Sequence, residues 1–134
     1  MGWAPDVLRD AGEDDGDVYV VGVRESTDPG SWSLLFMECL DADDEQDIEL
    51  GMDTYCLVVD PGQATHYGGV RECGITGGEL RLVFAEDAAA TLGLPVEKRF
   101  VLDLPAQQLE LLGRGLSRVL TSGRRDAVPH RLEV

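Results

Sequence analysis

Basic side chains are almost missing from the first half of this sequence of 134 residues. Residues 1–67 contain 17 acids but only two bases, Arg9 and Arg24, whereas residues 68–134 contain nine acids and nine bases. The formal net charge of −15 therefore arises wholly in the first half. A field of this sign repels the phosphates of nucleic acids and of anionic membranes, so we expect neither as a direct partner.

Long apolar runs and clustered cysteines are also missing. No stretch approaches the roughly 20 apolar residues that a membrane-spanning helix needs, and the first residues do not resemble a signal peptide. The three cysteines, Cys39, Cys56 and Cys73, are odd in number and far apart, which argues against an extracellular disulfide framework. We therefore expect a cytoplasmic protein, and the preference for arginine over lysine suggests a bacterial source.

Short β-branched and aromatic runs, separated by turn residues, predict five strands in succession. The turns between them are tight, so we expect antiparallel pairing in a β-meander. The second run is apolar on both of its faces, which predicts a central strand. The five runs cover residues 18–23, 32–37, 53–59, 66–73 and 80–84.

The last part of the sequence predicts two helices around a sixth strand. Residues 86–92 have acids in their first turn and are followed by a glycine and a proline, as at the end of a helix. Residues 100–104 alternate as a strand, and leucines recur at helical spacing after Pro105. We therefore expect an α+β fold: an antiparallel meander sheet of about six strands, a short helix, and a C-terminal amphipathic helix packed on one face.

The expected domain boundaries follow the same apolar pattern. Residues 1–16 have no apolar period and end in an acidic run, so we expect a loosely ordered N-terminal lead-in. Residues 17–122 are expected to form a single domain, and residues 123–134 a C-terminal tail. A chain of this length can bury a core without metal or disulfide bonds.

Residues suited to catalysis are few. A hydrolytic nucleophile needs a base, usually histidine, and the sequence has only His66 and His130. One interpretation pairs His66 with Cys56 or Cys73, which makes a small enzyme or a small-molecule-binding domain with a pocket near His66 the alternative function. The commoner fate of such cysteines is burial as inert core thiols. We expect no catalytic residue and no enzymatic activity.

The most acidic segment lies between two predicted strands and holds six acids within residues 41–49. Their spacing begins like a calcium-binding loop, but Gln46 stands where the turn needs glycine and Met52 where a glutamate ligand is needed. We therefore expect neither a metal nor a cofactor. The segment is either a solvated loop or a recognition surface for a basic partner. Its acids are Asp41, Asp43, Asp44, Glu45, Asp47 and Glu49.

Three segments, residues 33–38, 47–56 and 65–70, together resemble the immunity protein 10 family of bacterial polymorphic toxin systems. The resemblance runs from about Val18 to Leu120. Its most distinctive parts are Gly51-Met52-Asp53-Thr54-Tyr55-Cys56 and Tyr67-Gly68-Gly69.

The resemblance implies a non-enzymatic protein that binds and neutralises a cognate toxin encoded beside it. If that toxin is a nuclease, its groove is basic, and the six acids of residues 41–49 would compete as phosphate mimics. The candidate toxin-binding residues are these acids with Tyr55 and Tyr67, because interface hot spots favour tyrosine. Trp32 is a further candidate anchor, although we favour sheet packing as its role. The sequence does not indicate which oligomeric state the protein has.

Overall fold

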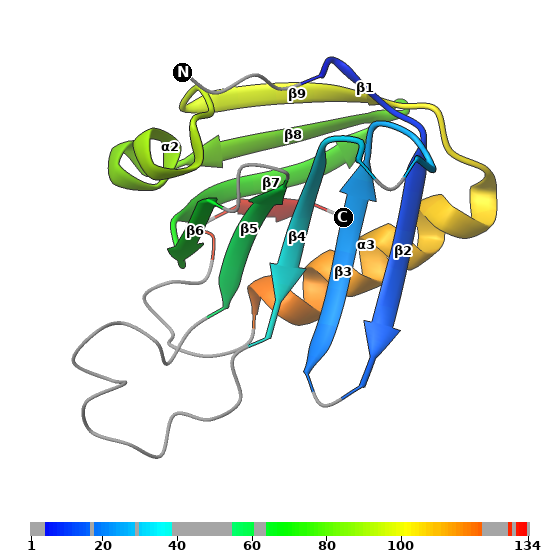
Figure 1. The fold of residues 1–134 in the computed structure, drawn as a ribbon, viewed down its shortest axis with the longest axis horizontal. Coiled ribbons are helices and arrows are strands. Elements are labelled where there is room, and N and C mark those ends of the chain that lie inside the picture. Colours follow the sequence, from blue (N-terminus) through cyan, green and yellow to red (C-terminus); the bar gives the residue numbers. More distant parts are fainter. Residues whose placement is uncertain are drawn as a thin grey trace.

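The computed structural model describes residues 5–16, 18–28, 30–38, 55–60, 64–121, 129 and 131–133. Within these residues, ten strands form two five-stranded sheets, and two helices pack against them (Figure 1). The α+β fold class is therefore confirmed. The expectation of one sheet of about six strands is corrected, because the strands divide between two sheets.

The first sheet, here called the meander sheet, is antiparallel throughout and orders its strands as they follow in the chain. β4 is its central strand, as the apolar pattern of residues 32–37 predicted. Alternation places Val21, Phe36 and Leu57 on the inner face, where each is fully buried. The strands are β2 (Asp10–Asp15), β3 (Tyr19–Arg24), β4 (Ser33–Met37), β5 (Cys56–Asp60) and β6 (Ala64–Tyr67).

The second sheet, here called the mixed sheet, has an antiparallel centre, β9-β8-β7, and two parallel edges. β1 pairs with β9 and β10 pairs with β7, so the two ends of the described chain close opposite edges of one sheet. The strands are β1 (Val7–Leu8), β7 (Val70–Thr76), β8 (Glu79–Phe84), β9 (Glu97–Leu102) and β10 (Arg131–Glu133).

Strands lie within both of the expected terminal segments. β1 and β2 lie within the expected lead-in, residues 1–16, and β10 lies within the expected tail, residues 123–134. The acids and glycine of β2 have low strand propensity. β2 nevertheless pairs with β3 over its whole length, and its Ala11 N–H donates to Gln108 Oε1 on the long helix at 3.2 Å. Tertiary pairing overrides the local preference here.

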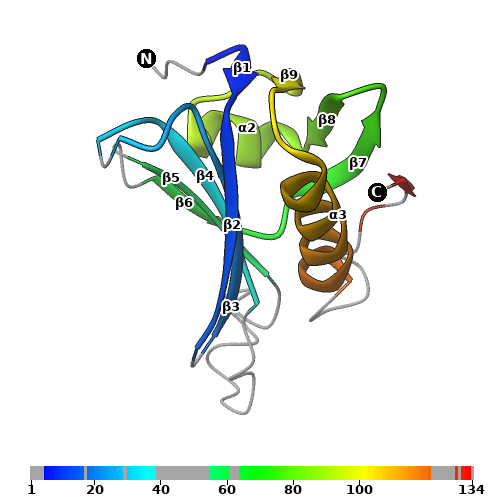
Figure 2. The ribbon, with the colours of Figure 1, turned by 90° about the vertical axis from the view of Figure 1, so that its right-hand side faces the viewer.

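The two helices occupy different places. α3 (Ala106–Leu120) lies on the inner face of the meander sheet, in the angle between the two sheets (Figure 2). α2 (Glu86–Leu92) has the bounds that the sequence predicted and packs against β6. Trp32 is buried and its ring lies 5.6 Å from that of Phe100, which ties the two sheets together as packing. No helix in the described part of the chain is long and apolar enough to cross a membrane.

The division into two sheets matches the division of charge. The meander sheet comes from residues 10–67, within the half of the sequence that carries the net charge of −15. All of the mixed sheet except the two-residue β1 comes from residues 70–133, where acids and bases balance. The half of the sequence that carries the net charge and the half in which charges balance therefore supply strands of different sheets.

Candidate functional site

The six acids expected to form a recognition segment, residues 41–49, lie outside the described residues. The structure describes the two points between which this segment runs. The chain leaves the meander sheet at Glu38, directly after β4, and returns at Tyr55, directly before β5. Both residues are buried, with 7% and 0% of their surface exposed. The acidic segment is therefore anchored on either side by residues fixed in the domain.

Glu38 is held by an ion pair with α3. Arg118 reaches Glu38 Oε1 with both Nε and Nη2 at 2.9 Å, and its guanidinium lies 4.0 Å from the centre of the Tyr19 ring. The hydrogen bond to the Glu38 carboxylate raises the pKa of Arg118. A buried carboxylate requires a charged partner of this kind. Sequence reasoning missed the pair because 80 positions separate its members.

Tyr55 lies in the core and is not placed to contact a partner. Its hydroxyl accepts a hydrogen bond from the Val70 N–H at 2.9 Å, and both residues are buried. Burial raises the pKa of Tyr55 to about 12. Tyr55 is a core residue in this structure, so we leave it out of the proposed contact surface.

Replacing Tyr55 by phenylalanine tests this assignment. The change leaves the buried Val70 N–H without its hydroxyl acceptor, so we expect the free energy of unfolding to fall by about 1–3 kcal/mol. Urea denaturation measures the loss, and faster hydrogen exchange of the Val70 amide locates it. Affinity for a partner, measured well below the melting temperature, should stay unchanged. Weaker binding by the folded variant would return Tyr55 to the contact surface.

The Tyr67-Gly68-Gly69 step is the corner at which the chain passes from the meander sheet to the mixed sheet. Both glycines have positive φ, 69° and 98°. A Cβ on Gly69 would lie 2.5 Å from the Cβ of Ala88 on α2, and the pairing of β7 shifts register just after Val70. Glycines inside a strand pattern are typical of a bulge or of a close backbone approach, and this corner has both. Tyr67 itself remains 36% exposed.

His66 does not form a nucleophilic pair with Cys56 or Cys73, the two cysteines that the structure describes. Cys56 and His66 occupy alternating positions in the paired strands β5 and β6, so their side chains lie on opposite faces of the sheet. His66 instead places Nε2 3.5 Å from Asp87 Oδ2. Cys73 lies buried in the mixed sheet, and burial raises its pKa to about 12, which keeps it a thiol at neutral pH. The pairing of His66 with Cys56 or Cys73 that the sequence left open is therefore not formed.

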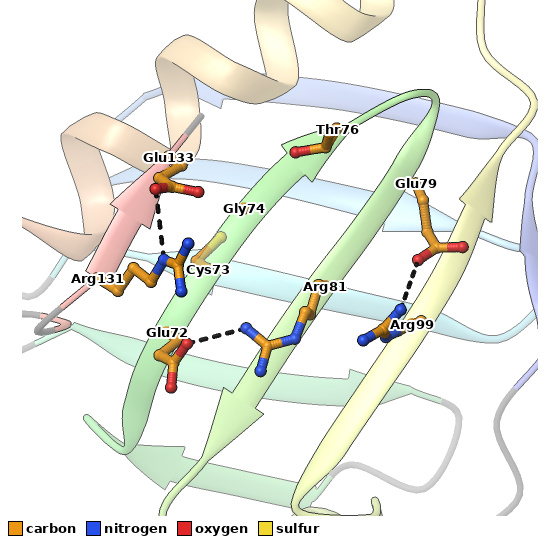
Figure 3. A pocket seen from close by; sticks show the side chains of 9 residues that line it. All are labelled: Glu72, Cys73, Gly74, Thr76, Glu79, Arg81, Arg99, Arg131 and Glu133. Atoms are coloured by element: carbon orange, nitrogen blue, oxygen red, sulfur yellow. Dashed lines mark hydrogen bonds and ion pairs between the residues drawn. The ribbon is translucent and has the colours of Figure 1, made fainter.

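The outer side of the mixed sheet has a hollow of about 380 Å³ whose charges are paired (Figure 3). Arginine and glutamate side chains alternate across its strands. No three His, Cys, Asp or Glu side chains of the described residues converge as a metal site. The hollow therefore presents a balanced surface. Its ion pairs are Arg81–Glu72 at 2.9 Å, Arg99–Glu79 at 3.7 Å and Arg131–Glu133 at 3.3 Å.

Comparison with known families gives one result. A family model described as immunity protein 10 matches residues 7–110. The match begins with β1 and extends into α3, so it includes the whole meander sheet and the central strands of the mixed sheet. No curated protein and no solved structure matches the chain.

Proposed function

The chain belongs to the immunity protein 10 family, and from this membership we propose that it binds and neutralises a cognate toxin of a bacterial polymorphic toxin system. The observation that carries the proposal is the family match over residues 7–110. In this proposal the protein is a cytoplasmic, stoichiometric inhibitor that needs no cofactor and no catalytic group.

We further propose that the toxin presents a basic surface, as the phosphate-binding groove of a nuclease does. The net charge of −15 lies in the half of the chain that builds the meander sheet, whereas the mixed sheet pairs its arginines with glutamates. A field of one sign steers an oppositely charged partner toward this side of the molecule. The acids of residues 41–49 and the exposed Tyr67 are the proposed contributors.

Co-purification tests the function. The protein is co-expressed with the product of the neighbouring toxin gene, and we expect a one-to-one complex in which the toxin's activity is lost. A tagged toxin that recovers none of this protein, and that kills cells producing it, would exclude the proposed function. An unrelated toxin of similar charge is the control, because an acidic protein binds basic proteins weakly without specificity.

A matched pair of charge variants tests the electrostatic part. Neutralising Asp43, Asp44 and Glu45 to their amides is expected to slow association with the toxin by about tenfold at low salt, with little effect at high salt. The control neutralises Glu86, Asp103 and Glu110, which are exposed acids of the second half and change the net charge equally. Stopped-flow mixing measures the association rate of each variant with the toxin. Equal rates for the two variants would contradict a role of the acidic segment while leaving inhibition intact.

A further inference from the structure

The outer face of the meander sheet, turned away from α3, is apolar along its centre. Val20, Leu35, Met37 and Val58 lie side by side on β3, β4 and β5, each half-buried. This face is turned toward the viewer in Figure 1, with α3 behind the sheet. In Figure 2, no labelled helix and no labelled strand of the mixed sheet lies against this face. This side of the meander sheet is called the outer face below, and these four residues are its apolar centre.

Such a face is unusual for an antiparallel sheet. When only one side of the sheet packs on a core, the other normally alternates to polar side chains. Here Leu35 lies across Gly22 on β3: a Cβ on Gly22 would be 2.5 Å from Leu35 Cδ2. On the next strand, a Cβ on Gly12 would meet no described atom within 4 Å. Gly12 and Gly22 thus add no side chain that could cover the four apolar residues, which stay partly exposed.

Acidic side chains border this apolar centre. Asp14 pairs with Val20 in register and is exposed, and Asp60 ends β5 on the same face. Asp10 lies there too but is paired with Arg24. The face therefore suits a partner with an apolar centre and a basic rim. A second copy of this chain would bring two net charges of −15 together, which argues against self-association.

We propose that the outer face is the docking surface for a basic protein, with Leu35, Met37 and Val58 buried at its centre. The inference rests on the proposed function, in which that protein is the toxin, and it adds which side of the molecule the toxin covers. Interfaces of this kind combine an apolar core that excludes water with a charged rim that speeds encounter.

A pair of matched substitutions tests the inference. Val58→Lys places a charge in the centre of the outer face, and Val101→Lys makes the same change on β9 of the mixed sheet, where Val101 is 50% exposed. With the neighbouring gene's toxin as the probe, Val58→Lys is expected to raise the Kd at least about tenfold, because central apolar contacts dominate interface energies. Val101→Lys is expected to leave the Kd within about twofold. Thermal melting checks that both variants are folded.

The possible outcomes separate this inference from the function on which it rests. If wild type and both variants bind the toxin equally, the outer face is not the docking surface while the immunity function stands. If the toxin binds none of them, the function fails and the inference fails with it. If Val58→Lys does not fold, hydrogen exchange of the wild-type protein with and without the toxin decides. The inference requires that toxin binding slow the exchange of β4 and β5 more than that of β8. A homodimer that Val58→Lys dissociates would assign the face to a second copy and overturn the proposal.

Discussion

Gly69→Ala is expected to lower the free energy of unfolding by about 4 kcal/mol, although it adds a single methyl group. Two costs combine. The backbone of Gly69 has a φ of 98°, a conformation that costs a residue with a side chain about 1–3 kcal/mol. The added Cβ would also lie 2.5 Å from the Cβ of Ala88, and such overpacking costs about 1–3 kcal/mol more. Urea denaturation measures the sum.

Two further variants separate these costs. Gly78 has a φ of 76°, and a Cβ there would meet no described atom within 4 Å, so Gly78→Ala isolates the backbone strain. Ala88→Gly in the Gly69→Ala background removes the clash and should restore part of the loss, beyond the roughly 1 kcal/mol that glycine costs in a helix. If Gly69→Ala were no more harmful than Gly78→Ala, the close approach of α2 to the corner would be refuted.

Gly69 also shows how far the sequence could predict the fold. A pair of glycines inside a predicted strand, as within residues 66–73, indicates a bulge or a close backbone approach, because that preference depends on only a few neighbouring residues. They did not predict that the chain leaves one sheet there and enters another. Sheet membership depends on contacts between distant residues, such as the ring contact of Trp32 with Phe100. Local signals accordingly located α2 to the residue, whereas the paired but strand-poor sequence of β2 was missed.

The candidate site shows the same limit. Tyr55 and Tyr67 both lie in predicted strands, and the two glycines after Tyr67 favour that residue for exposure. In the fold Tyr67 is 36% exposed, whereas Tyr55 is fully buried, which its sequence neighbours did not indicate. The outer face did leave a signal: residues 32–37 are apolar on both faces, which predicted a central strand correctly. The same pattern also means that Leu35 and Met37 point away from the core once α3 occupies the other side.

Raising the pH above 9 is expected to destabilise the protein by several kcal/mol before pH 12 is reached. Burial raises the pKa of Cys73 from 9 to about 12 and that of Tyr55 from 10 to about 12. Below pH 9 both groups are protonated in the folded and the unfolded chain, so they contribute no pH dependence. Between those unfolded values and pH 12 the native state binds more protons than the unfolded state. Stability therefore falls, by about 1.4 kcal/mol per pH unit for each group within its window.

Cys73→Ala identifies the thiol's share of this alkaline loss. Removing the sulfur lowers stability at every pH through the cavity it leaves, but that cost does not depend on pH. The decline that begins near pH 9 should therefore disappear from the variant, leaving the later decline from about pH 10, to which Tyr55 and Tyr19 both contribute because their pKa values are also raised to about 12. Urea denaturation at pH 8, 9, 10 and 11, with a reductant present, gives the two curves. Parallel curves for wild type and variant would show that Cys73 ionises as freely in the native protein as in the unfolded chain, and so that it is not buried between the two sheets.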